Sequence, residues 1–289
     1  ALLRNRQKLG VFVPYDVSPQ ELRDCLHEEL AQAIGPLNDL YRLPDSVFND
    51  DNVHTVLTGF DMLILRATYD PELRNGMTKD EVASVLPGIL ARLNPRGINV
   101  AERPVSKTPR SWIDAIQTAL GPGSTQAERR KAADAAALIA QQMGWNDHRR
   151  AFSHYILGRM VQIGDPELAQ QHYGASMHYL AQTPGTELQK AYVVTQTAAY
   201  AIATGKPGDA RRQVRSQLEV AARAENAALL STLMLLEAET LDLQGKEDQA
   251  EDVRLDSLGW ARYGFGSDWA VRARMQEVAA LNPRYRLGG

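Results

Sequence analysis

The sequence GDPELA at residues 164–169 returns as GKPGDA at 205–210 and as GKEDQA at 245–250. Each copy begins with glycine and ends with alanine, and the three glycines lie 41 and 40 residues apart. An amphipathic stretch precedes each copy and another follows it. Self-similarity at a nearly fixed period of this length is typical of a solenoid built from helix–turn–helix units. The spacing therefore predicts three antiparallel helix pairs over residues 147–263.

The glycine and the alanine of each copy have separate expected roles. Glycine adopts a left-handed backbone without steric cost, so it suits the turn within each helix pair. A small alanine lets the paired helices approach closely, so it should be buried where they meet. The turn residues are Gly164, Gly205 and Gly245, and the contact residues are Ala169, Ala210 and Ala250.

The G-x-x-x-x-A signature resembles that of tetratricopeptide (TPR) repeats, although its period exceeds that family's usual length of about 34 residues. Residues 111–120 and 125–143 are expected to form one further unit or a cap, and residues 268–280 the C-terminal capping helix. A non-repetitive helical bundle is the alternative architecture. Repeats of the TPR kind usually bind other proteins, so the resemblance implies a protein partner held by the inner surface of the solenoid.

The N-terminal third is expected to contain three helices and one strand. Each helix starts at a capping box, in which a Ser or Thr side chain and an acidic side chain three residues later satisfy the first backbone N–H groups. These pairs are Ser18 with Glu21, Thr58 with Asp61, and Thr78 with Glu81. The helices are expected over about residues 19–34, 58–69 and 78–93. The short apolar run LGVFVP at 9–14 predicts the strand.

The stretch HEELAQAIGPLND at residues 27–39 raises a question of chemistry. The extended zinc-peptidase motif is H-E-x-x-H-x-x-G-x-x-H, in which three histidines hold zinc and the glutamate is the general base. The present stretch keeps this spacing with other residue types, as E-E-x-x-Q-x-x-G-x-x-N-D. The positions are Glu28, Glu29, Gln32, Gly35, Asn38 and Asp39.

Two further motifs follow this helix. CLHEELAQAIGPLND at 25–39 is followed by DSVFNDD at 45–51 and by LTGFDMLILRATYDPELRNGMT at 57–78. With them, residues 22–93 resemble a bacterial domain family of unknown function (number 2927). That family is similar to zincin metallopeptidases in its motif helix, and no established activity comes with it. The resemblance implies a zincin-like helical domain whose N-terminal sheet is largely missing here.

Residues 94–110 carry three prolines and no apolar periodicity, which indicates a linker. The chain is therefore predicted to be mainly α. A degenerate zincin-like helical domain over residues 1–93 is followed by the linker and by a TPR-like α-solenoid over residues 111–289.

The residue types of the motif favour a site without metal. Gln32 and Asn38 replace histidines and offer only weak amide oxygens to a metal ion. We therefore expect no metal and no other cofactor. The motif should instead form a hydrogen-bonded cluster with the following loop, which contains Asn49 and Asp50.

The alternative is an unorthodox metallopeptidase. Glu28 and Asp39 would then hold the metal, and Glu29 would be the general base. Without such a metal, no catalytic residue is assigned.

Four tryptophans and one basic cluster complete the candidates. The tryptophans are expected to be helix-packing anchors, with contacts for a partner as the alternative, at positions Trp112, Trp145, Trp260 and Trp269. The basic cluster is expected to form a solvated face or, if it points inward, to meet an acidic partner. Its members are Arg211, Arg212 and Arg215.

Composition narrows the function classes. The net charge of −3 gives no electrostatic case for binding nucleic acid. No apolar run approaches the roughly 18 residues of a membrane span. The single cysteine permits no internal disulfide, and the chain does not begin with Met. The leading hypothesis is a non-catalytic scaffold subunit of a larger assembly, periplasmic or envelope-associated, with the cytoplasm as the alternative location.

Overall fold

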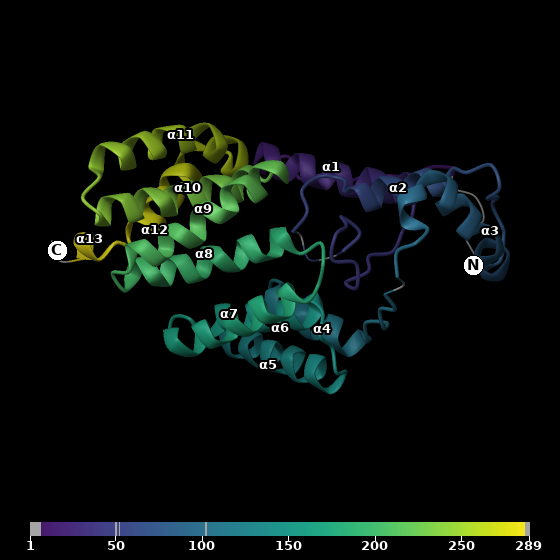
Figure 1. The fold of residues 1–289 in the computed structure, drawn as a ribbon, viewed down its shortest axis with the longest axis horizontal. Coiled ribbons are helices and arrows are strands. Elements are labelled where there is room, and N and C mark those ends of the chain that lie inside the picture. Colours follow the sequence, from purple (N-terminus) through teal and green to yellow (C-terminus); the bar gives the residue numbers. More distant parts are fainter. Residues whose placement is uncertain (1–6, 50, 52, 102, 287–289) are drawn as a thin grey trace. The chain divides into compact units, whose positions relative to one another are not determined.

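The protein is described from a computed structural model, which defines residues 7–49, 51, 53–101 and 103–286. Within this part of the chain all regular structure is helical and no strand occurs (Figure 1). The prediction of a mainly α fold is therefore confirmed. In the same residues, no helix combines the length and apolar composition that crossing a bilayer requires.

The chain divides into two compact units. Unit 1 comprises Ala1–Tyr15 and Leu22–Ser106, and unit 2 comprises Asp16–Glu21 and Lys107–Gly289. The boundary after Ser106 falls inside the proline-rich segment 94–110. Nothing in the sequence indicates that residues 16–21 group with the C-terminal unit.

Unit 1 contains three α-helices and a short 3₁₀ turn. Their bounds are α1 (Pro19–Ile34), whose first residues belong to unit 2, α2 (Gly59–Thr68), α3 (Lys79–Leu93) and η1 (Pro95–Gly97). The Thr58 hydroxyl caps α2 by accepting from the backbone N–H of Asp61, and the Asp61 carboxylate accepts from the N–H of Thr58. Thr78 and Glu81 form the same reciprocal pair at α3. Local capping chemistry thus determines where both helices begin.

The expected strand at 9–14 is not formed. Residues 7–14 carry no regular structure, and Phe12 and Val13 are 91% and 38% exposed. A strand needs a neighbour to take its backbone hydrogen bonds, and the described chain contains no second strand. An apolar run is therefore not enough to make a strand here.

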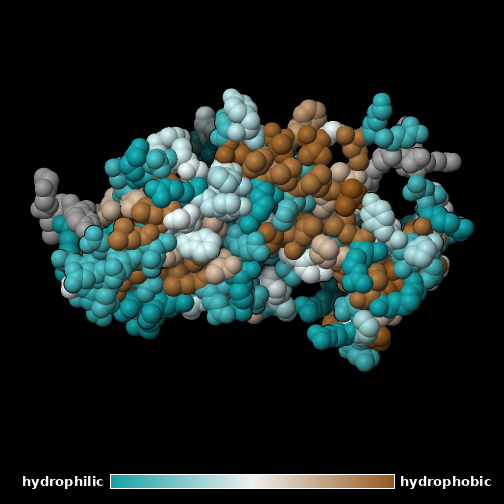
Figure 2. Space-filling model, turned by 90° about the horizontal axis from the view of Figure 1, so that it is seen from above, coloured by the Kyte–Doolittle hydropathy of each residue, from teal (hydrophilic) through white to brown (hydrophobic). Residues whose placement is uncertain are grey.

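The core of unit 1 forms where α1 meets α2 and the loop between them. Its buried residues are Ala31, Val47, Phe48 and Leu65, with Leu43 and Leu57 packed against them. The aliphatic residues that give α1 its apolar side lie largely outside this core, because Leu30 is 50% exposed and Ile34 52%. Hydrophobic side chains gather at the surface in the part of Figure 2 that α1 occupies.

Unit 2 is a succession of antiparallel helices. Their bounds are α4 (Arg110–Leu120), α5 (Gln126–Gln142), α6 (His148–Val161), α7 (Pro166–Ala181), α8 (Glu187–Ala203), α9 (Pro207–Arg223), α10 (Ala227–Leu243), α11 (Glu247–Phe265), α12 (Asp268–Ala279) and α13 (Pro283–Arg286). Each helix from α4 to α11 packs against the next in the chain. In Figure 1 this order is visible as hairpins that follow one another from α4 onward.

The repeated glycines lie between the two helices of a pair. Gly164 connects α6 to α7, Gly205 connects α8 to α9, and Gly245 connects α10 to α11. Gly205 and Gly245 have φ of 70° and 74°, as expected for a left-handed turn. Gly164 also lies in the turn of its pair, but its φ is not positive, so only the expected left-handed conformation is wrong there. There Asp165 caps α7 by accepting from the N–H of Leu168, and the turn closes without a left-handed residue.

The repeated alanines lie at helix contacts. Ala169, Ala210 and Ala250 are each 0% exposed. They occupy the first turn of α7, α9 and α11, where each helix packs against its predecessor in the pair. A side chain larger than a methyl group would have to displace that neighbour.

Helix α10 is buried on nearly every side, including its acidic residues. Glu237, Glu239 and Asp242 are 6%, 2% and 6% exposed. The Arg254 guanidinium of α11 contacts both Glu239, at 2.8 Å, and Asp242. Burial disfavours the charge on Arg254, but hydrogen bonds to these carboxylates outweigh it and raise its pKa. The charges inside unit 2 are thus held in pairs.

Two of the three arginines in the predicted basic cluster point toward α10, and the third lies at the surface. Arg215 and Arg211 place their Nε atoms 3.2 and 3.6 Å from the Glu237 carboxylate. Arg212 instead pairs with Asp209 at the surface. Two of the three arginines therefore neutralise a buried acid of α10.

The expected packing role is found for two of the four tryptophans and not for the other two. Trp112 is fully buried, donates to the Ser153 hydroxyl at 2.9 Å and meets Trp145 edge to face at 5.6 Å. Trp260 and Trp269 are 47% and 70% exposed. Within the described residues, no further helix covers the outer side of α11 and α12 to bury them.

Two histidines join α6 to α7. The Nδ1 atoms of His154 and His172 lie 3.2 Å apart, and their rings stack with Tyr179 beyond. Burial, followed by the charges of His172 and Arg150, lowers the pKa of His154 to about 4. Burial also lowers the pKa of His172, although the negative charge of the nearby Asp134 acts in the opposite direction. The helix pair therefore favours neutral imidazoles.

We predict that Ala210→Leu lowers the free energy of unfolding by about 1–3 kcal/mol, because overpacking forces α8 and α9 apart. Urea unfolding followed by circular dichroism measures this loss. The control is Ala222→Leu on the exposed side of α9, expected to change stability by no more than about 0.5 kcal/mol. Equal effects of the two substitutions would show that Ala210 is not at a tight contact.

The histidine pair predicts a pH dependence of stability. An unfolded histidine has a pKa near 6.5, so between pH 6.5 and 4 the unfolded chain binds more protons than the folded chain. The free energy of unfolding should therefore fall as the pH falls through this window. His154→Gln should reduce that fall, whereas His178→Gln, at an exposed position of α7, should leave it unchanged. Urea unfolding at pH 7, 5.5 and 4 tests this. If both variants lose as much stability as the wild type, the pair is not the cause.

Candidate functional site

The zincin-like motif lies on α1 and just beyond it. Glu28 and Gln32 are half-buried, and Glu29 and Asn38 are exposed. The Gln32 side-chain amide donates to the carboxylate of Asp39. The structure therefore brings the third and last positions of the motif together.

Gly35 owes its place in the motif to packing. It is buried directly after α1, and a β-carbon on it would lie 2.5 Å from Cδ2 of Leu65 and 2.9 Å from the carbonyl oxygen of Ala31. A side chain here would displace the Leu65 side chain of α2 and crowd the backbone of α1. The Tyr69 hydroxyl closes the same helix end by donating to the carbonyl of Ile34 at 2.7 Å.

The loop after the motif is bound by a residue of α2, whereas the sequence predicted that the motif residues of α1 would bind it. Asp61 of α2 is fully buried, and its carboxylate accepts from the Ser46 hydroxyl at 2.5 Å, the Val47 N–H at 3.1 Å and the Thr58 N–H at 2.8 Å. Asn49 is also buried and donates to the carbonyl of Leu43 at 2.6 Å. Asp50 lies outside the described residues.

A metal centre requires several ligand side chains around one point. Among the residues that the structure defines, no group of three His, Cys, Asp or Glu side chains is placed to hold an ion. The metallopeptidase alternative with Glu28, Glu29 and Asp39 therefore stays a prediction from the motif alone.

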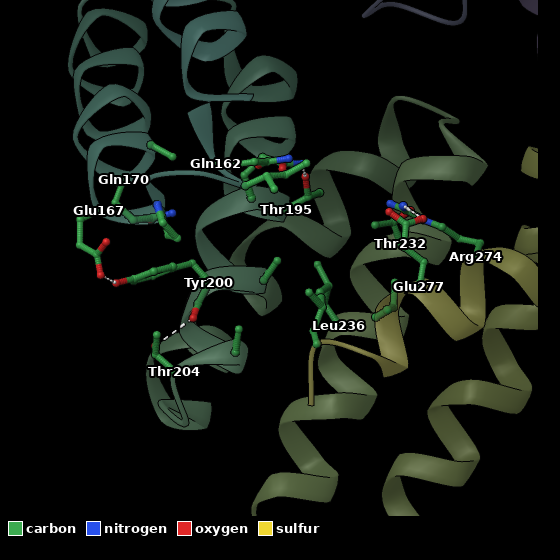
Figure 3. Close-up of a pocket in the computed structure, with 18 residues that line it drawn as sticks. Gln162, Glu167, Gln170, Thr195, Tyr200, Thr204, Thr232, Leu236, Arg274 and Glu277 are labelled. Atoms are coloured by element: carbon green, nitrogen blue, oxygen red, sulfur yellow. Dashed lines mark hydrogen bonds and ion pairs between the residues drawn. The ribbon is translucent and has the colours of Figure 1, made fainter. Parts of the chain in front are cut away.

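Unit 2 contains a groove of about 590 Å³, within the usual range of ligand pockets. It is bordered by the end of α6, the start of α7, one face of α8, and parts of α10 and α12 (Figure 3). Its polar lining comprises Gln162, Glu167, Gln170, Thr195, Gln196, Tyr200, Thr204, Thr232, Arg274 and Glu277. Its remaining lining is small or aliphatic: Ile163, Pro166, Ala169, Ala199, Ala203, Leu236, Val278 and Leu281.

Helix α8 supplies the floor of this groove through its periodicity. Thr195, Ala199 and Ala203 recur every fourth residue, and Gln196, Tyr200 and Thr204 form the adjacent row. Residues four apart lie on one side of a helix, so these rows make one continuous polar and small-residue face. The signal was present in the sequence TQTAAYAIAT at 195–204 but was missed, because small residues on a helix also suit packing.

Several groove side chains retain hydrogen-bonding capacity. Gln170 has no partner among the described residues. Gln162 accepts from the Tyr173 hydroxyl at 2.7 Å, and Gln196 donates to Thr195 at 3.0 Å. A side-chain amide has two N–H donors and a carbonyl with two lone pairs, so each of these glutamines can make further bonds.

The charged side chains lie at two opposite sides of the groove. In Figure 3, Glu167 reaches toward the Tyr200 hydroxyl, 3.5 Å away, on one side. On the other, Arg274 of α12 donates to Glu277 at 2.7 Å and to Thr232 at 3.2 Å. The second group is neutral as a whole, so Glu167 carries the uncompensated charge of the lining.

The family comparison concerns unit 1. Residues 3–88 match the family described as "Protein of unknown function (DUF2927)". This confirms the resemblance based on the motifs between residues 25 and 78, over less than a third of the chain. No curated protein and no solved structure matches the chain.

The buried Asp61 gives a prediction for unit 1. Asp61→Asn should lower the free energy of unfolding by about 1.5–3 kcal/mol, because an amide cannot accept all three hydrogen bonds and turns a donor toward other donors. Urea unfolding measures the loss, and amide hydrogen exchange should accelerate at Val47 and Phe48. Asp80→Asn, exposed in the first turn of α3, serves as the control. Unchanged exchange at Val47 would contradict the role given to Asp61.

Proposed function

We propose that this chain is a protein-interaction subunit and that the groove of unit 2 binds a peptide segment of a partner. The observation that carries the proposal is the groove itself, with small residues on its floor and glutamine amides of open bonding capacity around it. An extended peptide needs hydrogen-bond partners for its backbone and room for alternate side chains. The lining supplies both.

The arrangement favours binding over chemistry. The described groove residues include no histidine or cysteine, and the Tyr200 hydroxyl meets the Glu167 carboxylate only at the long distance of 3.5 Å. The two carboxylates of the groove differ in their partners. Glu277 forms an ion pair with Arg274, whereas the contact seen for Glu167 among the described residues is a hydrogen bond from the Tyr200 hydroxyl. The helical repeat supports this proposal, because stacked helix pairs expose long surfaces used for partners.

The proposed setting is a larger assembly at the cell envelope or in the periplasm, with the cytoplasm as the alternative. Fractionation of the native organism tests this location. A cytosolic native protein would remove the envelope from the proposal and leave the groove unaffected.

Blocking the groove tests the function. Peptides selected from a random display library on the immobilised full chain are synthesised, and their Kd is measured by fluorescence anisotropy. Ala199→Arg places a long charged side chain on the floor of the groove and should weaken binding more than about tenfold. Ala222→Arg, on the exposed side of α9, should not. Circular dichroism confirms that both variants remain folded. Failure to select any peptide, or equal binding by both variants, would overturn the proposal.

A further inference from the structure

The charged residues of the groove also indicate which kind of peptide would bind there. Glu167 is exposed in the first turn of α7, and the Tyr200 hydroxyl, at the long distance of 3.5 Å, is the hydrogen-bond partner seen for it among the described residues. A carboxylate has about four acceptor positions, so most of its capacity remains open. Glu167 is thus ready to accept from a charged donor.

The opposite side of the groove carries no net charge that would attract a charged ligand. Arg274 and Glu277 neutralise each other, with 2.7 Å between Nη1 and Oε2, and Arg274 also donates to Thr232. A ligand carboxylate would have to displace Glu277 to reach the guanidinium. The net attraction of the lining is therefore for a cation, and it is concentrated at the α7 side.

The glutamines lie on helices that border the space between these two sides. Gln170 is one turn after Glu167 on α7, and Gln196 is one turn before Tyr200 on α8. A peptide whose basic side chain meets Glu167 would therefore bring its backbone past both amides. Each amide can donate to a backbone carbonyl and accept from a backbone N–H.

Resting on the proposed function, we infer that the groove selects an extended peptide segment with a lysine or arginine, whose cationic side chain pairs with Glu167 while Gln170 and Gln196 bind its backbone. An acidic side chain in the same position is rejected by like charge. The basic residue fixes the register of the peptide along α8, and the backbone contacts tolerate varied residues on either side.

The size of the effect follows from exposure. An exposed ion pair contributes little and is screened by salt, so a lysine should improve affinity over its neutral counterpart by about two- to fivefold at low ionic strength. Charge reversal should give a larger contrast, because it replaces attraction by repulsion.

The test uses the full chain and a library of acetylated, amidated hexapeptides with one position varied at a time. On the wild type, lysine and arginine should be enriched at one position. Glu167→Gln should lose that preference, and Glu167→Lys should shift it to aspartate and glutamate. Glu187→Lys, a charge reversal at an exposed first-turn residue of α8 outside the groove lining, is the control and should keep the wild-type preference.

The outcomes separate this inference from the proposed function. Peptides that bind in a manner blocked by Ala199→Arg but show no charge preference, or keep it in Glu167→Gln, would overturn the inference alone. An absence of groove-dependent binding for every peptide would overturn both. A preference that reverses in Glu167→Lys is the result expected here.

Discussion

The structure of unit 2 depends on keeping the charges of α10 paired while that helix is buried. Glu237, Glu239 and Asp242 lie inside the helical stack, and an unpaired acid there would cost several kcal/mol. Arginines of α9 and α11 reach them from either side. This requirement fixes how α9 and α11 face α10. Hydrophobic contact alone, which is not directional, would leave their rotation open.

The same helix is anchored at its start by a distant part of the chain. The Gln20 side chain accepts from the N–H of Ala228 at 2.9 Å and donates to Asn226 at 3.2 Å. Asn226 in turn accepts from the N–H of Leu229 and donates to Tyr192. The first N–H groups of α10 are thus satisfied by side chains, as a buried helix end requires. This explains why residues 16–21 group with unit 2.

Local signals predicted the elements better than their contacts. Capping residues and the repeated glycines located the helices to within a few residues, because caps and turns depend on neighbours in sequence. Periodicity could not reveal features that depend on residues distant in sequence. These are the absence of a strand at 9–14, the exposure of Trp269 and the pairing of Arg211 with Glu237. Gly35 likewise reads as a helix stop, yet the close approach of Leu65 is what excludes a side chain there.

The groove could not be predicted from the sequence because α8 both packs in the helical stack and borders the groove. Ala191, Ala198 and Ile202 are fully or almost fully buried on one side, and Ala199, Tyr200 and Thr204 border the groove on the adjacent side. Small and weakly polar residues also occur on the packed side of this helix, so no clear amphipathic stripe in the sequence marks the side that borders the groove. The consequence is that the two faces can change separately. Substitutions on the packed side act through stability, whereas under the proposed function those at the more exposed positions of the groove side, such as Ala199 and Tyr200, should act on which segment is bound.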